Sequence, residues 1–114
     1  MSLKTQDLFD VSNKVVVVTG GSRGIGEMIT SGFLANNSKV YITARKEEAL
    51  VKKAEELSQK YSCECIPVSG DISNSEGIDA LVNFLNDAES EGIDFLINNA
   101  GAAWGANYDD FPES

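Results

Sequence analysis

The stretch Thr19-Gly20-Gly21-Ser22-Arg23-Gly24-Ile25-Gly26 decides the fold of this chain. It directly follows an apolar run of β-branched residues at 15–18 and leads into a segment with helical periodicity. Glycine lacks the Cβ that would block a sharp turn or a close approach to a ligand. The N–H groups at the start of the helix then face an anion, usually a pyrophosphate. Glycines at 20, 24 and 26, between a strand and a helix, therefore predict a dinucleotide-binding loop.

Strand and helix patterns alternate along the rest of the chain. Strands are expected at 15–18, 40–42, 63–68 and 95–97. The first and last are of the buried type, and Pro67 suits a strand at the edge of a sheet. Helical stripes are expected through Ile25, Met28, Ile29, Phe33 and Leu34, through Leu50, Ala54 and Leu57 within 47–60, and through Ile78, Leu81, Val82 and Leu85. Asn36-Asn37-Ser38 should end the first helix, and Ser73-Asn74-Ser75-Glu76 has the pattern of a capping box before the third.

This order of elements, βαβαβαβ with short connections, predicts an α/β fold. Such alternation gives a Rossmann-type doubly wound parallel sheet with right-handed crossovers. Four strands correspond to the N-terminal half of that fold, with the expected strand order 3-2-1-4. The chain has 114 residues and no internal repeat or linker, so residues 1–114 are expected to form one NAD(P)-binding domain.

Composition and charge exclude several classes of function. The formal net charge of −9 argues against nucleic acid as a partner, which needs clustered Lys and Arg. The sequence contains no run of 18 apolar residues, so it predicts no membrane span. Its first ten residues lack the pattern of a secretory signal. Cys63 and Cys65 are expected to be buried free thiols rather than a disulfide or a metal site, and the chain has no histidine. These features together predict a cytoplasmic protein.

The end of the second strand indicates which dinucleotide is preferred. An acidic residue that binds the adenosine ribose of NAD is expected about 20 residues after the glycines. That place reads Thr43-Ala44-Arg45-Lys46, and the first carboxylate is Glu47. Arg45, with Arg23 from the glycine loop, can bind a 2′-phosphate through guanidinium groups, which predicts NADP rather than NAD. The alternative is that both arginines are solvated surface residues.

Two further strand ends face the expected ligand crevice. Asp71 and Ile72 follow the third strand, where they could meet the edge and face of an adenine. The alternative for Asp71 is a turn residue at a helix entry. Asn98-Asn99-Ala100-Gly101 closes the fourth strand, and its amides could either face a ribose or tie neighbouring strands together.

In these motifs the chain resembles the short-chain dehydrogenase/reductase family. The glycine loop, Asp71 after the third strand and Asn98-Asn99-Ala100-Gly101 after the fourth stand in the family's order and spacing. The resemblance implies a fixed set of cofactor-binding residues. Gly20, Gly21, Ser22, Arg23 and Ile25 would bind the pyrophosphate and adenosine side, Gly24 and Gly26 would shape the turn, Arg45 would favour NADP, Asp71 and Ile72 would hold adenine, and Asn98, with Ala100 and Gly101, would lie at the ribose.

The segment 98–113 is similar to the 3-oxoacyl-(acyl-carrier-protein) reductase-like members of rhamnolipid-synthesis type, on Trp104, Gly105 and Phe111-Pro112-Glu113. The resemblance implies hydride transfer from NADPH to a carbonyl or 3-oxoacyl substrate. It also implies a homo-oligomer in the full-length form.

The chain departs from the family in its catalytic residues. Members use a tyrosine with a lysine four residues later, but Tyr41, Tyr61 and Tyr108 are followed at that spacing by Arg45, Cys65 and Pro112. No catalytic residue can be assigned, and the chain corresponds to about half of a member of roughly 250 residues, the length of two nucleotide-binding halves. We expect a fragment that stops before the catalytic half and is inactive alone. The alternatives are a non-catalytic nucleotide-binding module and an inactive truncated product.

Overall fold

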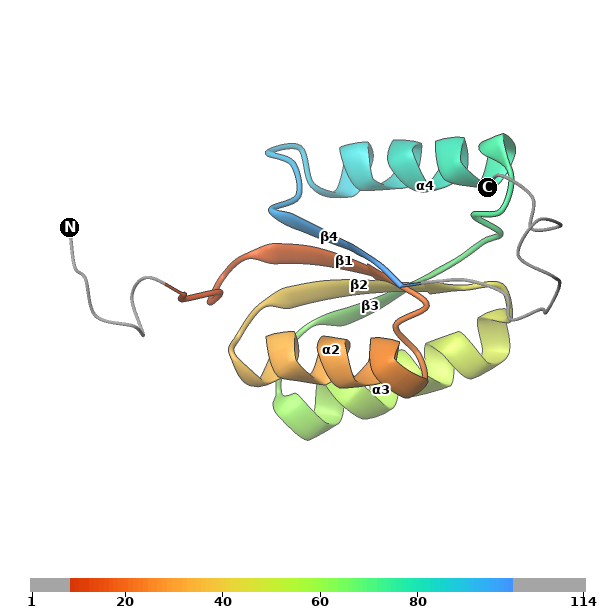
Figure 1. The fold of residues 1–114 in the computed structure, drawn as a ribbon. Helices are drawn as coiled ribbons and strands as arrows, with labels where there is room; N and C mark the ends of the chain where they lie inside the picture. Colours follow the sequence, from red (N-terminus) through yellow and green to blue (C-terminus); the bar gives the residue numbers. More distant parts are fainter. Residues whose placement is uncertain (1–8, 100–114) are drawn as a thin grey trace, which may run out of the picture.

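A computed structural model describes residues 9–99 of the chain, and they form one parallel sheet covered by three helices (Figure 1). The elements alternate from β1 to β4 as the sequence predicts. Their bounds are β1 Val15–Thr19, α2 Gly24–Ala35, β2 Lys39–Ala44, α3 Glu47–Tyr61, β3 Cys65–Ser69, α4 Ser75–Ala88 and β4 Phe95–Asn98.

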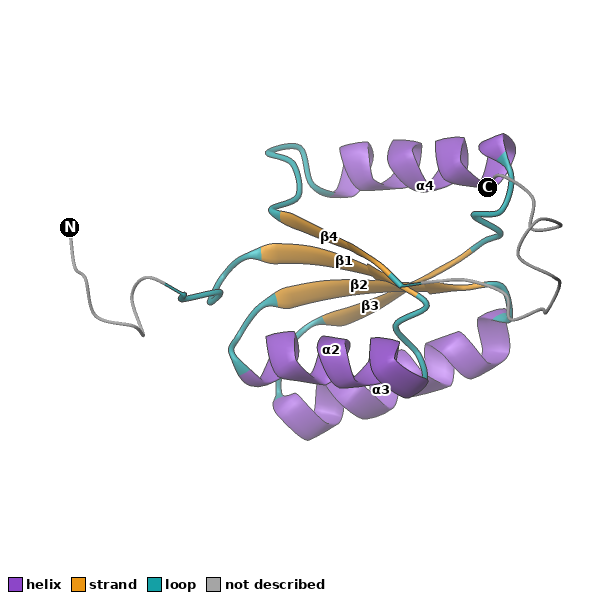
Figure 2. Cartoon of the chain, in the orientation of Figure 1, coloured by secondary structure: helices purple, strands orange, loops and turns teal. Residues whose placement is uncertain are grey.

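The sheet has the strand order β3-β2-β1-β4, and every pairing is parallel. Both the predicted α/β class and the predicted order are therefore confirmed. Helices α2 and α3 cover one face of the sheet and α4 covers the other (Figures 1 and 2). All four strands end at the same side of the sheet, so the loops that follow them lie together there. This carboxyl edge carries the residues considered below.

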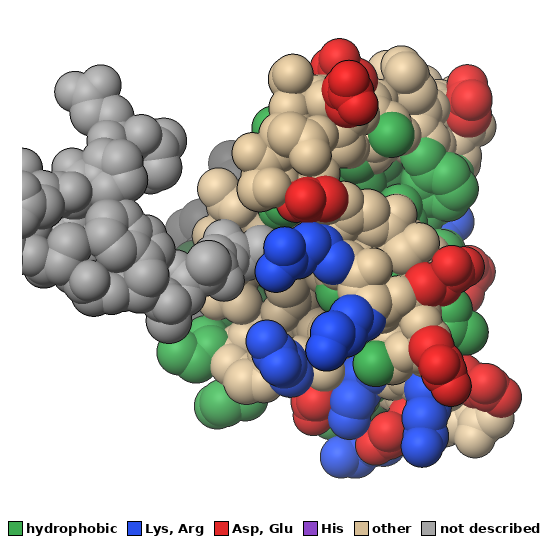
Figure 3. Space-filling model, turned by 90° about the vertical axis from the view of Figure 1, so that its right-hand side faces the viewer, with side chains coloured by type: hydrophobic (Ala, Val, Ile, Leu, Met, Phe, Trp, Pro, Cys, Tyr) green, Lys and Arg blue, Asp and Glu red, His purple; other side chains and the backbone are tan. Residues whose placement is uncertain are grey.

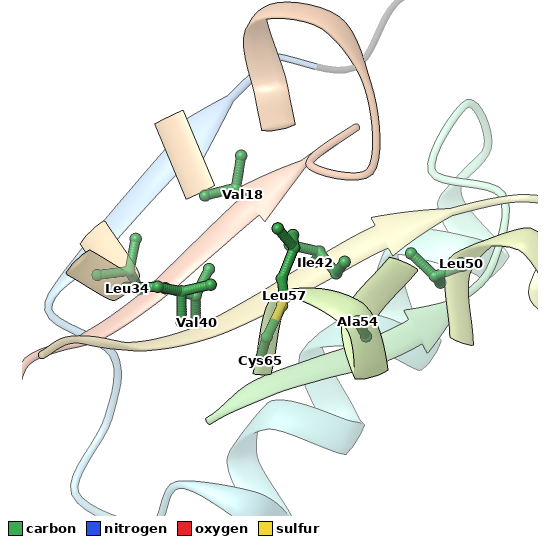
Figure 4. Close-up of a cluster of buried hydrophobic side chains, with 9 residues drawn as sticks. Val18, Leu34, Val40, Ile42, Leu50, Ala54, Leu57 and Cys65 are labelled. Carbon is green, nitrogen blue, oxygen red and sulfur yellow. The ribbon is translucent and has the colours of Figure 1, made fainter. Parts of the chain in front are cut away.

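The main core lies between the sheet and the α2–α3 layer. Alternate residues of the central strands point to this face, since successive side chains of a strand point to opposite faces. Side chains of β1, β2 and β3 meet those of α2 and α3 in this core (Figure 4). Its buried members are Val16, Val18, Leu34, Val40, Ile42, Leu50, Ala54, Leu57 and Cys65. Burying a Val, Leu or Ile side chain contributes about 1.5–3 kcal/mol, so each of these residues stabilises the contact between the sheet and the two helices.

The first helical stripe is only partly buried, which corrects the sequence-based prediction. Leu34 is buried, and Ile29 and Phe33 pack against the core. Ile25 and Met28, in contrast, are 70% and 73% exposed. They lie in the first two turns of α2, where no described element covers their side of the helix.

The opposite face has a smaller core under α4. Val17 and Tyr41 are buried there with Leu85, and Leu81 packs beside them. Ile78 and Val82, expected in the same stripe, are both 47% exposed. Within the described part of the chain α4 is the one helix on this face. No neighbour therefore covers the flank of the stripe that these two residues form.

The last strand is less buried than its apolar sequence suggests. Phe95 and Leu96 are 40% and 59% exposed, although β4 was expected to be a buried strand. Strand β4 lies at an edge of the sheet and pairs with β1, and among residues 9–99 no strand pairs with its outer side. Phe33 of α2 stacks on Phe95, with ring centroids 6.2 Å apart, and covers part of one face.

Two local predictions also need correction. The N-cap of α4 is Asn74 rather than Ser73, because the Asn74 side chain accepts a hydrogen bond from the Gly77 N–H at 2.8 Å. The Ser73 side chain instead binds Asp71. The third strand begins at Cys65 rather than Cys63, since α3 extends to Tyr61 and Ser62 ends it in the left-handed region, with φ of 50°.

The two cysteines are free thiols, as predicted, but only Cys65 is buried. Cys63 is half-buried, and its thiol donates to the Ser38 carbonyl oxygen. Burial raises the pKa of Cys65 to about 12, with a smaller contribution from Cys63. Among residues 9–99 no cluster of His, Cys, Asp or Glu is suited to a metal ion, and none of the helices there has the length and apolarity to cross a membrane.

Candidate functional site

The glycine loop lies at the carboxyl end of β1 and leads directly into α2. Gly20 has φ of +67° and Gly24 φ of +60°, in the left-handed region that glycine adopts without strain. The Gly20 N–H donates to the Thr43 carbonyl oxygen of β2 at 3.0 Å, which holds the loop against the neighbouring strand end. The loop therefore turns where the sequence predicted, and two of its glycines are required by backbone conformation.

Gly21 and Gly26 are required by packing instead. A Cβ on Gly21 would lie 2.6 Å from Ile42 Cγ2 and 2.7 Å from Thr30 Oγ1, inside the 3.0 Å that real Cβ atoms essentially never breach. A Cβ on Gly26 would collide with the Gly20 carbonyl oxygen. The Thr30 hydroxyl lies 2.9 Å from the Gly26 carbonyl oxygen and 3.2 Å from that of Gly21, so it ties the loop to the helix.

The first backbone N–H groups of α2 lie beside the glycine loop, and no side chain of the N-cap residue binds them. The N-cap residue is Arg23, which has extended backbone and makes no side-chain cap hydrogen bond. Ser22 beside it is half-buried, and Arg23, Gly24 and Ile25 are exposed. A helix start carries unpaired N–H groups and about half a positive charge, so it favours a bound anion.

Thr19 organises the junction between β1 and β4, and sequence reasoning missed it. Its hydroxyl donates to Asn98 Oδ1 at 3.1 Å and accepts from the Asn99 N–H at 2.8 Å. Asn99 Nδ2 also lies 3.5 Å from the Gly20 carbonyl oxygen. Of the two roles considered for the asparagines, tying neighbouring strands together is the one visible here. The signal for Thr19 is its place as the polar residue that closes an apolar strand before a glycine loop.

Asp71 and Ile72 follow β3 at the same edge. The Asp71 carboxylate accepts hydrogen bonds from the Ser73 hydroxyl and, at 2.9 Å, from the Ser73 N–H. The two Ser73 bonds lower the pKa of Asp71, and the charge of Arg45 lowers it further. Asp71 is thus a fixed carboxylate on a turn, with Arg45 near enough to act on it.

A hollow of about 260 Å³ opens beside this turn, between α4 and the ends of β2 and β3. Its wall is mostly apolar, with a few polar groups at the strand ends. It is lined by Thr43, Val68, Ser69, Gly70, Ile72, Gly77, Ala80, Leu81 and Phe84. A concave apolar surface beside convergent polar groups is typical of small-ligand sites.

Basic side chains gather at the carboxyl edge. Arg23 follows β1, while Arg45 and Lys46 follow β2, and all three are exposed. Figure 3 looks onto this edge and shows Lys and Arg side chains across its middle and lower part, with one acidic side chain directly above them and others at the top, at the right and below. The chain as a whole has a net charge of −9 and repels anions, but this group of basic side chains attracts an anion locally.

The structure therefore brings the glycine loop, Arg45, Asp71, Ile72 and Asn98 to one edge of the sheet. Two predicted site residues, Ala100 and Gly101, lie outside the described residues, as do the positions 104–113 that carry the subfamily resemblance.

Comparison with known proteins identifies the family. Residues 14–114 match the family model described as short chain dehydrogenase. The chain belongs to the short-chain dehydrogenase family. The sequence-based recognition of this family is thereby confirmed.

Curated relatives extend the likeness to individual members. The chain is 40% identical, over 106 residues, to the rhamnolipids biosynthesis 3-oxoacyl-[acyl-carrier-protein] reductase of Pseudomonas aeruginosa. This match covers 93% of the chain and 40% of the relative. The short-chain dehydrogenase/reductase PhomF of Diaporthe leptostromiformis is also 40% identical, over 88% of the chain and 33% of that protein. The chain thus spans about two fifths of the length of the first relative.

Solved structures give the same result. The Pseudomonas aeruginosa RhlG/NADP active-site complex matches with a TM-score of 0.77 and 38% identity, over 82% of this chain and 37% of that one. L-Sorbose reductase from Gluconobacter frateurii, complexed with NADPH and L-sorbose, matches with a TM-score of 0.81 and 32% identity, over 92% and 40%. The first complex holds NADP and the second holds NADPH.

Proposed function

We propose that this chain is the NADP-binding half of a reductase that transfers hydride from NADPH to a carbonyl or 3-oxoacyl group. Residues 1–114 would then form one dinucleotide-binding domain, and the substrate pocket would belong to the rest of the protein. The similarity to a 3-oxoacyl-[acyl-carrier-protein] reductase supports the acyl substrate class. NADPH would supply the hydride, and the residues of this chain would bind and orient it.

One observation carries the cofactor preference. The strand end that follows β2 presents Arg45 and Lys46, both exposed, where an NAD-binding chain would present a carboxylate. A guanidinium binds phosphate through two parallel hydrogen bonds, and each charged hydrogen bond contributes about 1.5–3 kcal/mol. The NADP complexes of the two structural relatives agree with this assignment.

The remaining site residues would divide the work along the dinucleotide. The start of α2 and the Gly20–Arg23 loop would hold the pyrophosphate, because their backbone can approach it closely. Asp71 and Ile72 would meet the adenine, and Asn98 and the adjoining Ala100 and Gly101 would lie toward the ribose. Thr19 would act through Asn98 and Asn99, whose positions it fixes.

Isothermal titration of the 114-residue chain with NADP and with NAD tests the cofactor assignment. We expect NADP to bind at least tenfold more tightly, as one additional charged hydrogen bond implies. A chain that binds NAD more tightly than NADP would refute it. The chain Arg45→Lys is the matched control, because it keeps the charge and removes only the two-pronged geometry.

A second candidate function is nucleotide binding without catalysis. None of the three tyrosines has a lysine four residues later, and Tyr41 is buried at the sheet with its hydroxyl bonded to Glu89. Carbonyl reduction that appears when the chain is joined to a downstream half bearing Tyr-x-x-x-Lys supports the reductase, and binding with no such activity supports the module.

A further inference from the structure

The C-terminal end of α4 is held to the sheet by three side chains, here named the Glu89 clamp: Lys39, Tyr41 and Glu89. Glu89 is the C-cap residue of α4. Its carboxylate accepts a hydrogen bond from the Tyr41 hydroxyl and lies 2.7 Å from the Lys39 ammonium. Lys39 and Tyr41 are two residues apart on β2, so both reach the same face of the sheet.

The clamp offsets a local electrostatic conflict. The C-terminal end of a helix carries a partial negative charge, so a carboxylate there is unfavourable, and α4 has no basic residue in its last turn. Lys39 supplies the missing cation from the sheet. The bonds from Lys39 and Tyr41 lower the pKa of Glu89, and the bond to Glu89 raises the pKa of Lys39. The Tyr41 hydroxyl, on a side chain only 2% exposed, finds its partner in the same carboxylate.

Little else fixes α4 to the sheet. Leu85 is its one buried residue in the structure, with Leu81 half-buried next to it. Phe84 meets the Tyr41 ring edge-on at 6.1 Å, directly beside the clamp. A helix with so narrow an apolar contact depends on its end contacts for its position.

The other end of α4 abuts the nucleotide edge. Gly77, in the first turn, lies so close to the carbonyl oxygen of Asp71 that a Cβ there would collide with it. Gly77, Ala80, Leu81 and Phe84 also line the hollow beside Ile72. At 1.5 Å per residue the 14 residues of α4 span about 21 Å. The clamp and the Asp71 turn are thus at opposite ends of one rigid element.

We propose that Lys39, Tyr41 and Glu89 are positioning residues for the adenine side of the nucleotide site, acting through α4 on Asp71 and Ile72. The proposal rests on the proposed function for its ligand and on the geometry above for its mechanism. A helix released at Glu89 would shift against Asp71 and widen the hollow, while Arg45, on the loop after β2, would keep its place.

Hydrogen exchange tests the mechanical part without any ligand. Lys39→Met should speed exchange of the amides at 77–81, and Lys39→Arg, which keeps the cation, should restore protection. Glu64→Gln is the matched control, because Glu64 reaches the same lysine only at 3.8 Å. Faster exchange confined to 85–89, or equal exchange in all three variants, would overturn the proposal.

Binding of adenosine 2′,5′-bisphosphate tests the functional part through double-mutant cycles. Lys39→Met should weaken binding roughly two- to thirtyfold, the usual range for couplings of this kind. The loss should shrink when Asp71 is already replaced by Ala and stay unchanged in an Arg45→Ala background. Equal losses in both backgrounds would refute a role through Asp71. No binding by the unmutated chain would instead refute the proposed function and leave the exchange result as the test of the coupling.

Discussion

Replacing Gly26 by Ala should destabilise the chain and abolish dinucleotide binding, whereas Gly32→Ala in the same helix should do neither. A Cβ at 26 would lie 2.6 Å from the side-chain nitrogen of Asn99 and closer still to the backbone carbonyl of Gly20. A Cβ at 32 meets nothing within 4 Å. The pair therefore separates packing in the loop from the intrinsic preference of helices for Ala.

The magnitudes follow from these distances. Overpacking a well-packed site costs about 1–3 kcal/mol, and the obstacle at Gly26 is backbone, which yields less readily than a side chain. Ala in place of Gly within a helix is favourable by about 0.5–1 kcal/mol. The two variants should therefore differ by roughly 1.5–4 kcal/mol in free energy of unfolding.

Urea unfolding followed by circular dichroism gives the free energies, and titration with NADP gives the affinities. Affinity is compared below the unfolding transition, where both variants are folded. Equal stability of the two variants would contradict the packing at Gly26. Unchanged NADP binding by folded Gly26→Ala would contradict the role of the loop as a phosphate cradle.

Three other predictions concern a substitution, the activity of the chain alone and the dependence of its stability on pH. Arg45→Asp should lower NADP affinity about ten- to a hundredfold, because it removes a charged hydrogen bond and adds repulsion, and calorimetry that shows no loss would exclude Arg45 from the site. The purified 114-residue chain should not oxidise NADPH with carbonyl substrates, since general acid catalysis contributes about 10²–10⁴-fold and no Tyr-x-x-x-Lys pair is present. Steady oxidation of NADPH, followed by the loss of its near-ultraviolet absorbance, would refute this. The free energy of unfolding should fall as pH rises above 9, because the unfolded Cys65 thiol ionises near its ordinary pKa of 9.0 and the folded one near 12. Cys65→Ala should flatten that dependence.

The parts of the fold that depend on local sequence could be predicted. Gly20 and Gly24 were recognised from spacing alone, and each has the positive φ that makes glycine necessary. The alternation of strands and helices predicted a parallel sheet, and the dinucleotide-binding fold indicated by the glycine loop supplied the strand order 3-2-1-4.

The sequence-based errors in burial arose where no neighbouring element covers a helix. Periodicity identified one face of α2 and one of α4, but Met28 and Val82 are exposed because no described neighbour reaches them. The cap of α4 was misplaced by one residue because Ser73 and Asn74 both have capping side chains. The Ser73 hydroxyl donates to Asp71 instead, so Asn74 is the residue that caps the helix.

Contacts between distant residues were beyond sequence reasoning. Thr19 meets Asn98 across 79 positions, and Tyr41 meets Glu89 across 48. Neither pair has a spacing that sets it apart from other polar residues. Their partners follow only from the parallel register and from the length of α4, which no local pattern encodes.

The two edges of the sheet are unlike one another in a way that limits how copies could join. Glu64 and Gly70, which flank β3, both bond to β2 through their backbone. Odd-numbered positions of β3 therefore face outward, so the nitrogen of Pro67 faces outward and offers no hydrogen to an incoming strand. Proline at such a place blocks addition. Strand β4 has no proline and carries Phe95 and Leu96 half in solvent. Within residues 9–99, a strand added edge to edge would therefore find hydrogen-bonding groups along β4 and a proline in its way on β3.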